Sequence, residues 1–284
     1  MWERGIQNMG KGTIMIEPCA GLGNRLLALT SAYELSKKLD KELTVIWKRE
    51  IGCAIAAKDL FEMSVPVAEI SEMGMKHGVI EHLRSNQAKK KYRESADVFI
   101  ECDEIADAKT AGGFAAVKEM IAAHDTCYVK SYTNLCEITA ESFSFLKPAP
   151  EVLKRGEAVF ARIGKNTVGV HIRRTDHVES TSHSPLTAFV ERMKAEPEDT
   201  SFYVTTDDAA TIQELETYFP KERLIVYEDK VLDRDSKTGI QDALVDMLCL
   251  SRCRKILGSY QSTFSLIPSI MGQTELVYCM KEQK

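Results

Sequence analysis

The alternation of apolar and polar segments is clearest in the second half of the chain. Short apolar runs predict strands at residues 167–172, 201–205, 223–226, 255–258 and 275–279. Stretches with helical spacing of apolar residues lie between them, at 186–195, 209–218, 240–253 and 265–271. Regular alternation of strands and helices is typical of a doubly wound parallel sheet, so we expect an α/β fold here.

The first half begins in the same way and then becomes less regular. An apolar strand at 13–16 is followed by a glycine turn, a helix at 26–39 and a second strand at 43–47. This order predicts a β-α-β unit at the start of a Rossmann-like domain. Further on, 58–63, 71–77 and 114–123 are expected to be helical or loop-like, and 127–132 is expected to be a strand.

A proline pair marks the predicted boundary between two domains. Pro148 and Pro150 interrupt regular structure, and a helix is expected to follow over 151–163. We therefore predict a first Rossmann-like domain at 1–149 and a second at 150–284.

Composition and charge indicate which kinds of partner and which cellular location to expect. The 284 residues are 44% hydrophobic and 28% charged, as in an ordinary globular protein, and the net charge of −5 argues against nucleic acid as a partner. No apolar run approaches the roughly 20 residues of a membrane span, and the first 11 residues lack the apolar core of a signal peptide. Eight cysteines are scattered through the chain, several inside apolar runs, which favours reduced thiols and a cytoplasmic location.

Charged residues end the apolar strand at 168–172. His171 belongs to this run, and Arg173, Arg174 and Asp176 follow it. Ligands of open α/β sheets bind at the carboxyl ends of strands, where paired guanidinium groups suit a dianionic phosphate. A structural ion pair between an arginine and Asp176 is the alternative.

A second predicted strand ends in Asp207 and Asp208, at the same edge of the sheet. At least one of them is expected to cap the following helix. A metal pair is disfavoured because adjacent residues point apart, so no metal site is expected. Cys249 and Cys253 stand one helical turn apart but lack further ligands nearby for zinc.

Two turns could bring the backbone close to a ligand. Gly21 and Gly23 precede Asn24 and Arg25, but Leu26 stands where a dinucleotide fingerprint has its third glycine, which argues against a nicotinamide cofactor. A purely structural turn is the alternative.

The other turn contains Ser262 and Thr263, which open a helix and could bind phosphate there, or Ser262 could be an ordinary cap. Asp242 and Asp246 lie on one helix face, which could simply be solvated. The basic run at 89–93 is interpreted as a solvated helix face rather than an acceptor or membrane-binding surface.

The residues at 170–176, Val-His-Ile-Arg-Arg-Thr-Asp, resemble the strand-end motif of the GDP-fucose-dependent fucosyltransferases. This superfamily includes alpha-1,6-, nodulation-type and protein O-fucosyltransferases. Further similar elements occur in the same order: Gly-Leu-Gly-Asn at 21–24, Thr-Asp-Asp at 206–208, and Asp-x-x-x-Leu-Ser at 246–251 before the Ser/Thr turn. The matches span residues 13–271 without a motif in the middle of the first half.

The resemblance implies the architecture of two Rossmann-like domains called GT-B, with the acceptor held mainly by the first domain. It implies inverting, metal-independent transfer of fucose from GDP-fucose to a hydroxyl of a carbohydrate or other acceptor, and no cofactor. A transferase of the same fold with another donor, or a non-catalytic nucleotide- or glycan-binding protein, are the alternatives.

Residue roles follow from the matched motifs. Arg173 would neutralise the leaving diphosphate; Asp176, Asp207 or Glu17 could serve as general base. The donor would contact His171, Arg174, Asp207, Asp208, Ser262, Thr263 and the turn residues Gly21, Gly23 and Arg25, with Asn24 beside the reacting groups. Asp246 would accept hydrogen bonds from the guanine edge, which would select GDP over UDP.

Overall fold

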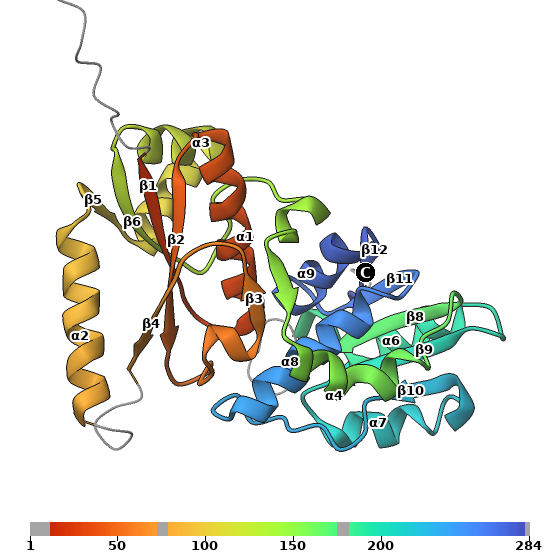
Figure 1. The fold of residues 1–284 in the computed structure, drawn as a ribbon. Helices are drawn as coiled ribbons and strands as arrows, with labels where there is room; N and C mark the ends of the chain where they lie inside the picture. Colours follow the sequence, from red (N-terminus) through yellow and green to blue (C-terminus); the bar gives the residue numbers. More distant parts are fainter. Residues whose placement is uncertain (1–11, 73–78, 175–181, 282–284) are drawn as a thin grey trace, which may run out of the picture. The chain divides into compact units, whose positions relative to one another are not determined.

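The structure is a computed structural model that describes residues 12–72, 79–174 and 182–281 (Figure 1). The chain forms two compact units. The first comprises Met1–Ala20, Asn24–Arg49 and Met63–Ile138, and the second comprises Gly21–Gly23, Glu50–Glu62 and Thr139–Lys284.

The first unit is built on a five-stranded parallel sheet in the order β4-β2-β1-β6-β5. Its strands are β1 (Thr13–Pro18), β2 (Glu42–Arg49), β4 (Val67–Ser71), β5 (Val98–Ile100) and β6 (Thr126–Ser131). Its helices are α1 (Leu22–Lys38), α2 (Val79–Glu94) and α3 (Cys102–Ala122).

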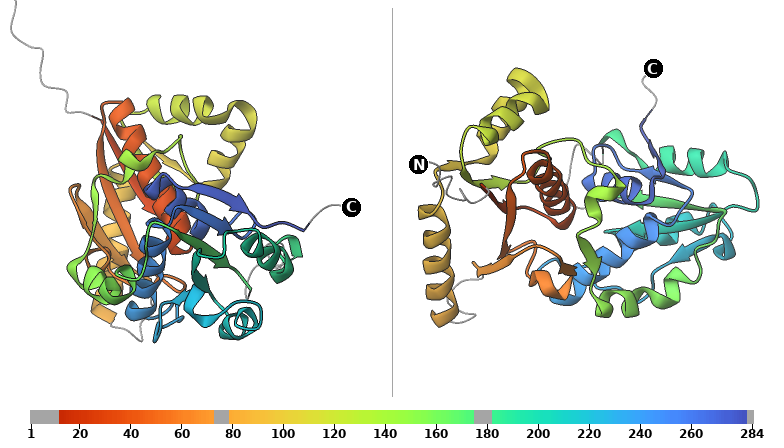
Figure 2. Two further views of the ribbon diagram at one scale, coloured as in Figure 1. Left: turned by 90° about the vertical axis from the view of Figure 1, so that its right-hand side faces the viewer. Right: turned by 45° about the horizontal axis from the view of Figure 1, so that its top comes forward.

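Successive side chains along each strand point to opposite faces of this sheet, and different helices pack on the two faces. Met15 and Tyr128 pack with Tyr92 of α2, whereas Trp47, on the opposite face, lies under the Arg25 guanidinium of α1. The right-hand view of Figure 2 shows α2 on one side of the sheet and α1 on the other. Within α3, Gly113 has φ of +64°, a backbone conformation that favours glycine, and the helix kinks there.

The second unit contains a parallel sheet in the order β10-β9-β8-β11-β12. In chain order this is 3-2-1-4-5, the strand order of a Rossmann-like doubly wound sheet. The strands are β8 (Thr167–Ile172), β9 (Ser201–Thr206), β10 (Leu224–Val226), β11 (Lys255–Gly258) and β12 (Glu275–Tyr278). A separate two-stranded sheet pairs β3 (Phe61–Met63) with β7 (Leu146–Pro148).

Helices cover both faces of this sheet. They are α4 (Pro150–Phe160), α6 (Leu186–Lys194), α7 (Ala209–Leu215), α8 (Lys237–Leu250) and α9 (Thr263–Gly272). Val168, Val170 and Ile172 point into a core with α6 and α7. Gly169 faces the other way, where an added Cβ would lie 2.8 Å from Leu250 of α8, so close helix–sheet packing requires glycine there.

The predicted α/β class is confirmed, and every strand and helix expected in the second half is present within a few residues. In the first half, the sequence failed to predict β4, β5 and the first part of α3. The helical or loop-like interpretation of 58–63 was wrong for Phe61–Met63, which is β3, and residues 73–78 lie outside the described part. Within the described residues, no helix is long and apolar enough to cross a membrane.

Candidate functional site

The strand order of the second unit indicates that a ligand would bind at the sheet edge between β8 and β11. From β8 the chain moves to β9 and β10 on one side, and it later returns to β11 and β12 on the other. Ligands bind outside the carboxyl ends of the strands where the order reverses in this way. His171 is paired in register with Gly258, so the segments that follow these two residues emerge side by side.

His171 is a buried, neutral residue at this edge. Its Nδ1 lies 2.8 Å from Ser265 Oγ, and its ring stacks on Phe264 with centroids 4.8 Å apart. Burial, helped by nearby cations such as Arg173 and opposed by Asp207, lowers the pKa of His171 to about 3. A neutral imidazole can bind and orient a ligand, but at physiological pH it carries no positive charge that would attract a phosphate.

Hydrogen bonds fix the backbone from which both predicted arginines extend. The Arg173 N–H donates to Ser259 Oγ at 2.9 Å, and that hydroxyl in turn donates to the His171 carbonyl at 3.1 Å. The Arg174 N–H donates to Asp207 Oδ1 at 2.7 Å. Both arginines are half-buried. The structure therefore anchors their main chain on β9 and on the turn after β11; Asp176 lies outside the described residues.

The turn after β11 supplies the second half of the site. Gln261 has φ of +50°, and the Ser262 N–H donates to the Ser259 carbonyl at 3.2 Å, which closes the turn before α9. Ser262 occupies the N-cap position but makes no side-chain capping bond, and its buried Oγ has no hydrogen-bond partner among the described residues. A buried polar group left unsatisfied at a helix N-terminus fits the binding of an anionic ligand. Thr263, also predicted, is half-buried at the first position of α9.

The two aspartates that follow β9, Asp207 and Asp208, make different contacts. Asp208 caps α7, accepting from the Ala210 N–H at 3.2 Å and from the Thr211 hydroxyl at 2.7 Å. The hydrogen bond from Thr211 is the main reason that the pKa of Asp208 is lowered. The capping prediction is thus confirmed for Asp208, whereas Asp207 lies beside His171 and Arg174.

Asp246 holds a buried polar network beneath the ends of β9. It accepts from the Tyr203 hydroxyl, from Thr205 Oγ1 at 2.7 Å and from Lys230 Nζ at 2.9 Å. Burial raises the pKa of Tyr203 far above its ordinary value, which keeps this donor protonated. These contacts favour a structural task for Asp246, namely holding Lys230; a contact with guanine stays a prediction.

Lys230 is a cation that the sequence analysis missed. Its side chain is 12% exposed, and its ammonium lies close enough to His171 to lower the pKa of that residue. It comes from the irregular segment after β10, which has no motif and no periodicity to mark it. The solvated-face interpretation of α8 was also wrong, because Asp242 is buried and paired with Arg155 at 2.7 Å.

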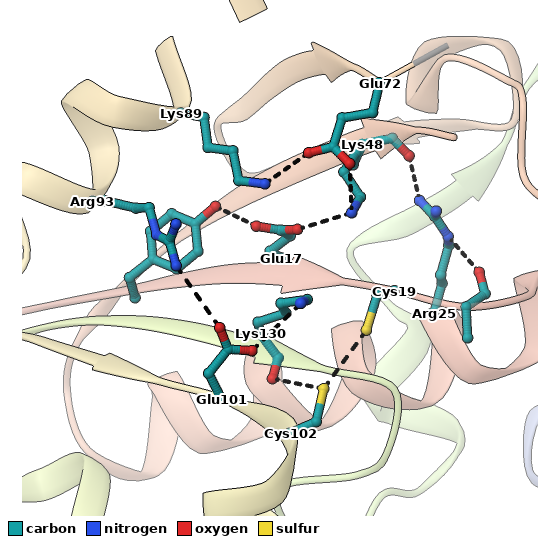
Figure 3. Close-up of polar contacts among 12 residues, drawn as sticks. Glu17, Cys19, Arg25, Lys48, Glu72, Lys89, Arg93, Glu101, Cys102 and Lys130 are labelled. Carbon is teal, nitrogen blue, oxygen red and sulfur yellow. Dashed lines mark hydrogen bonds and ion pairs between the residues drawn. The ribbon is translucent and has the colours of Figure 1, made fainter. Parts of the chain in front are cut away.

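Arg25 directly follows the Gly-Leu-Gly-Asn turn and is held by hydrogen bonds to backbone carbonyls. Arg25 is fully buried and donates from Nε to the Ala20 carbonyl at 2.8 Å and from Nη1 to the Lys48 carbonyl at 2.6 Å (Figure 3). Its guanidinium lies over the Trp47 ring. These bonds favour a role in holding the turn over direct contact with a ligand. Asn24 is half-buried and Gly21 is exposed.

Gly23 allows a close approach to the Ser/Thr turn. Both Gly23 and Thr263 belong to the second unit, and a Cβ added to Gly23 would lie 2.7 Å from Thr263 Oγ1. Two of the predicted elements, far apart in sequence, are therefore adjacent in space.

A charged network in the first unit contains Glu17, one of the candidate general bases. Glu17 is fully buried, accepts from the Tyr128 hydroxyl at 2.5 Å and lies 3.4 Å from Lys48 Nζ, which also approaches Glu72 (Figure 3). Burial alone would raise the pKa of Glu72, but a hydrogen bond from Lys89 and the charge of Lys48 lower it overall. Because Lys89 belongs to α2, the network ties that helix to the sheet, which favours a structural role for Glu17. Among the described residues, no cluster of His, Cys, Asp and Glu side chains could hold a metal ion.

The two parallel sheets with helices on both faces define an α/β protein with two Rossmann-like units. No protein-family model and no curated protein matches the sequence. Among solved structures, the chain is similar to the alpha-1,6-fucosyltransferase NodZ soaked with GDP-fucose, with 18% identity, a TM-score of 0.61, and 92% of this chain and 93% of that chain covered.

Two other solved fucosyltransferases are similar over most of the chain. POFUT1 in complex with GDP has 13% identity and a TM-score of 0.54, with 94% of this chain and 98% of that chain covered. A mutant of Arabidopsis thaliana FUT1 in complex with GDP has 14% identity and a TM-score of 0.59, with 94% of this chain and 70% of that chain covered. The chain thus has the fold of these GT-B-like fucosyltransferases, which confirms the fold that the motifs implied.

Proposed function

We propose that this protein is a glycosyltransferase that transfers fucose from GDP-fucose to a hydroxyl of a carbohydrate or other acceptor, with inversion and without a metal. The observation that carries the proposal is the meeting of two predicted motifs between β8 and β11. The backbone of Arg173 is bonded to the Ser259 turn, and Ser262 stands at the N-cap position of the next helix with a hydroxyl that has no hydrogen-bond partner among the described residues. The fold shared with fucosyltransferases bound to GDP or GDP-fucose supports the choice of donor.

In this proposal the site binds the donor through its diphosphate. The helix start at Ser262 and Thr263 offers backbone N–H groups and hydroxyls to the phosphate oxygens. Arg173 and Arg174 offer the planar, bidentate donors that suit phosphate. As the bond between the anomeric carbon and the phosphate oxygen breaks, negative charge grows on the leaving GDP, and fixed cations stabilise it.

The remaining groups of the site keep this arrangement in place. Lys230, held by Asp246, adds positive charge near the strand ends. Neutral His171 supports the turn through Ser265 and Phe264 and is not the proton acceptor. We assign the second unit to the nucleotide sugar and the first to the acceptor, and we keep Asn24, Asp176 and Asp207 as candidates for groups near the reacting hydroxyl.

A transfer assay tests the proposal. The protein is incubated with GDP-fucose and a panel of carbohydrate acceptors in EDTA, and GDP release and glycosylated product are measured. We expect a fucosylated product whose anomeric configuration is opposite to that of the donor. Product only after addition of a divalent cation would contradict the metal-independent step, and retention of configuration would contradict inversion. Transfer only from another nucleotide sugar would overturn the donor.

A further inference from the structure

Two cysteines of the first unit lie within reach of each other. Cys19 follows β1 and Cys102 begins α3, 83 residues later, yet their Sγ atoms are 3.8 Å apart (Figure 3). Among the described residues, three other cysteine thiols donate to backbone carbonyls: Cys127 to that of Ile121, Cys136 to that of Ser31 and Cys253 to that of Cys249. The contact between Cys19 and Cys102 instead joins two thiols.

The two thiols also differ in accessibility. Cys102 is half-buried at the first position of its helix and donates to the Lys130 carbonyl at 3.3 Å. Cys19 is buried, and burial together with the nearby Cys102 raises its pKa to about 12. A reagent from solvent can therefore reach Cys102, and Cys19 is placed to attack a sulfur bound there.

We propose that Cys19 and Cys102 form a redox-modification site, which small disulfides such as glutathione disulfide convert reversibly into an intramolecular disulfide. Cys102 loses its proton and attacks one sulfur of glutathione disulfide, releasing one glutathione and leaving a mixed disulfide. Cys19 then attacks the Cys102 sulfur and displaces the second glutathione. Both protein thiols are oxidised, one glutathione disulfide is reduced, and the two protons end on the two glutathione thiols.

The bond would tether a turn that the rest of the structure already holds. An S–S bond is about 2.0 Å long, so the two sulfurs must move together by less than about 2 Å. The Cys19 N–H donates to the Ser131 carbonyl at 3.0 Å, and the next residue, Ala20, accepts from Arg25. Oxidation would therefore pull Cys19 and Ala20, the residues just before the Gly-Leu-Gly-Asn turn, toward α3. Its effect on transfer rests on the proposed function, whereas formation of the bond does not.

The test is titration of the full chain with glutathione disulfide, followed by thiol counting and tryptic mass mapping without reduction. We expect the loss of two free thiols and a cross-linked pair of peptides, 12–25 with 94–109, each of which contains one cysteine. Reduced dithiothreitol should restore both thiols. The oxidised protein should melt roughly 5–10 °C higher, because the bond closes a long loop.

Matched variants complete the test. Cys102→Ser should abolish the cross-linked peptides, whereas Cys136→Ser, at another thiol of the same unit, should leave them unchanged. An unchanged thiol count in wild-type protein at a glutathione disulfide concentration that oxidises a control dithiol, or cross-links between other cysteines, would overturn the site. If the disulfide forms but transfer by oxidised and reduced protein is equal, the modification stands and its effect on the turn is refuted.

Discussion

Acidification should destabilise the protein through His171, whose imidazole is buried with Ser265 and Phe264. The pKa of His171 is about 3 in the folded chain, below the ordinary value of 6.5. Between these two pH values the unfolded chain binds a proton at His171 that the folded chain does not bind. The contribution of neutral His171 to stability is therefore fully present above pH 6.5 and is lost as the pH falls toward 3. The loss approaches about 1.4 kcal/mol per pH unit, or about 2.5 kcal/mol at pH 4.5 relative to neutral pH.

The assay is urea unfolding followed by far-ultraviolet circular dichroism between pH 7.5 and 4.5. His171→Asn removes the titrating group, so its free energy of unfolding should fall less steeply with acid than that of wild type. His183→Asn, at an exposed histidine of the same unit, is the control and should retain the wild-type slope. Parallel pH profiles of wild type and His171→Asn would refute the reasoning, as would NMR titration of His171 near pH 6.5.

Three further predictions concern the same edge of the sheet. Arg173→Ala should lower the transfer rate about 100-fold or more, because one preorganised donor is lost, while Arg192→Ala, at an exposed position of α6, should not; a loss below threefold would contradict the role of Arg173. Asp246→Asn should destabilise the fold by about 3 kcal/mol in chemical denaturation, because Lys230 keeps its buried charge without a counterion; unchanged stability would show that Lys230 finds another partner. Ser262→Ala should leave the free protein as stable or up to about 1 kcal/mol more stable, yet weaken GDP binding several-fold in calorimetry; a destabilised free protein would mean that the hydroxyl is already satisfied.

The second unit could be predicted from sequence because its strands are short, apolar and followed by charged or small residues. The central strand β8 is buried throughout, and its apolar pattern ends where the ligand edge begins. The first unit resisted prediction for the opposite reason. The strand β5 has only three residues, and α2 is mostly polar with a run of lysines at 89–91, so neither has a strong hydrophobic period.

The candidate site was predictable only where residues sit in motifs next to strands. His171 lies near the end of β8, whereas Arg173, Asp207 and Ser262 follow strand ends, and parallel topology brings those ends together. Lys230 could not be found in this way, because its place depends on a tertiary ion pair with Asp246. The burial of Arg25 was equally hidden, since its partners are backbone carbonyls that any sequence would supply.

The most direct test of the central claim is isothermal titration calorimetry of the full chain in EDTA with GDP-fucose, GDP-mannose and a UDP-sugar. The account predicts that GDP-fucose binds without metal, more tightly than the other two, and that Arg173→Ala weakens this binding while Arg192→Ala does not. Equal or tighter binding of GDP-mannose or the UDP-sugar would contradict the donor, and no binding of any nucleotide sugar would contradict the site between β8 and β11.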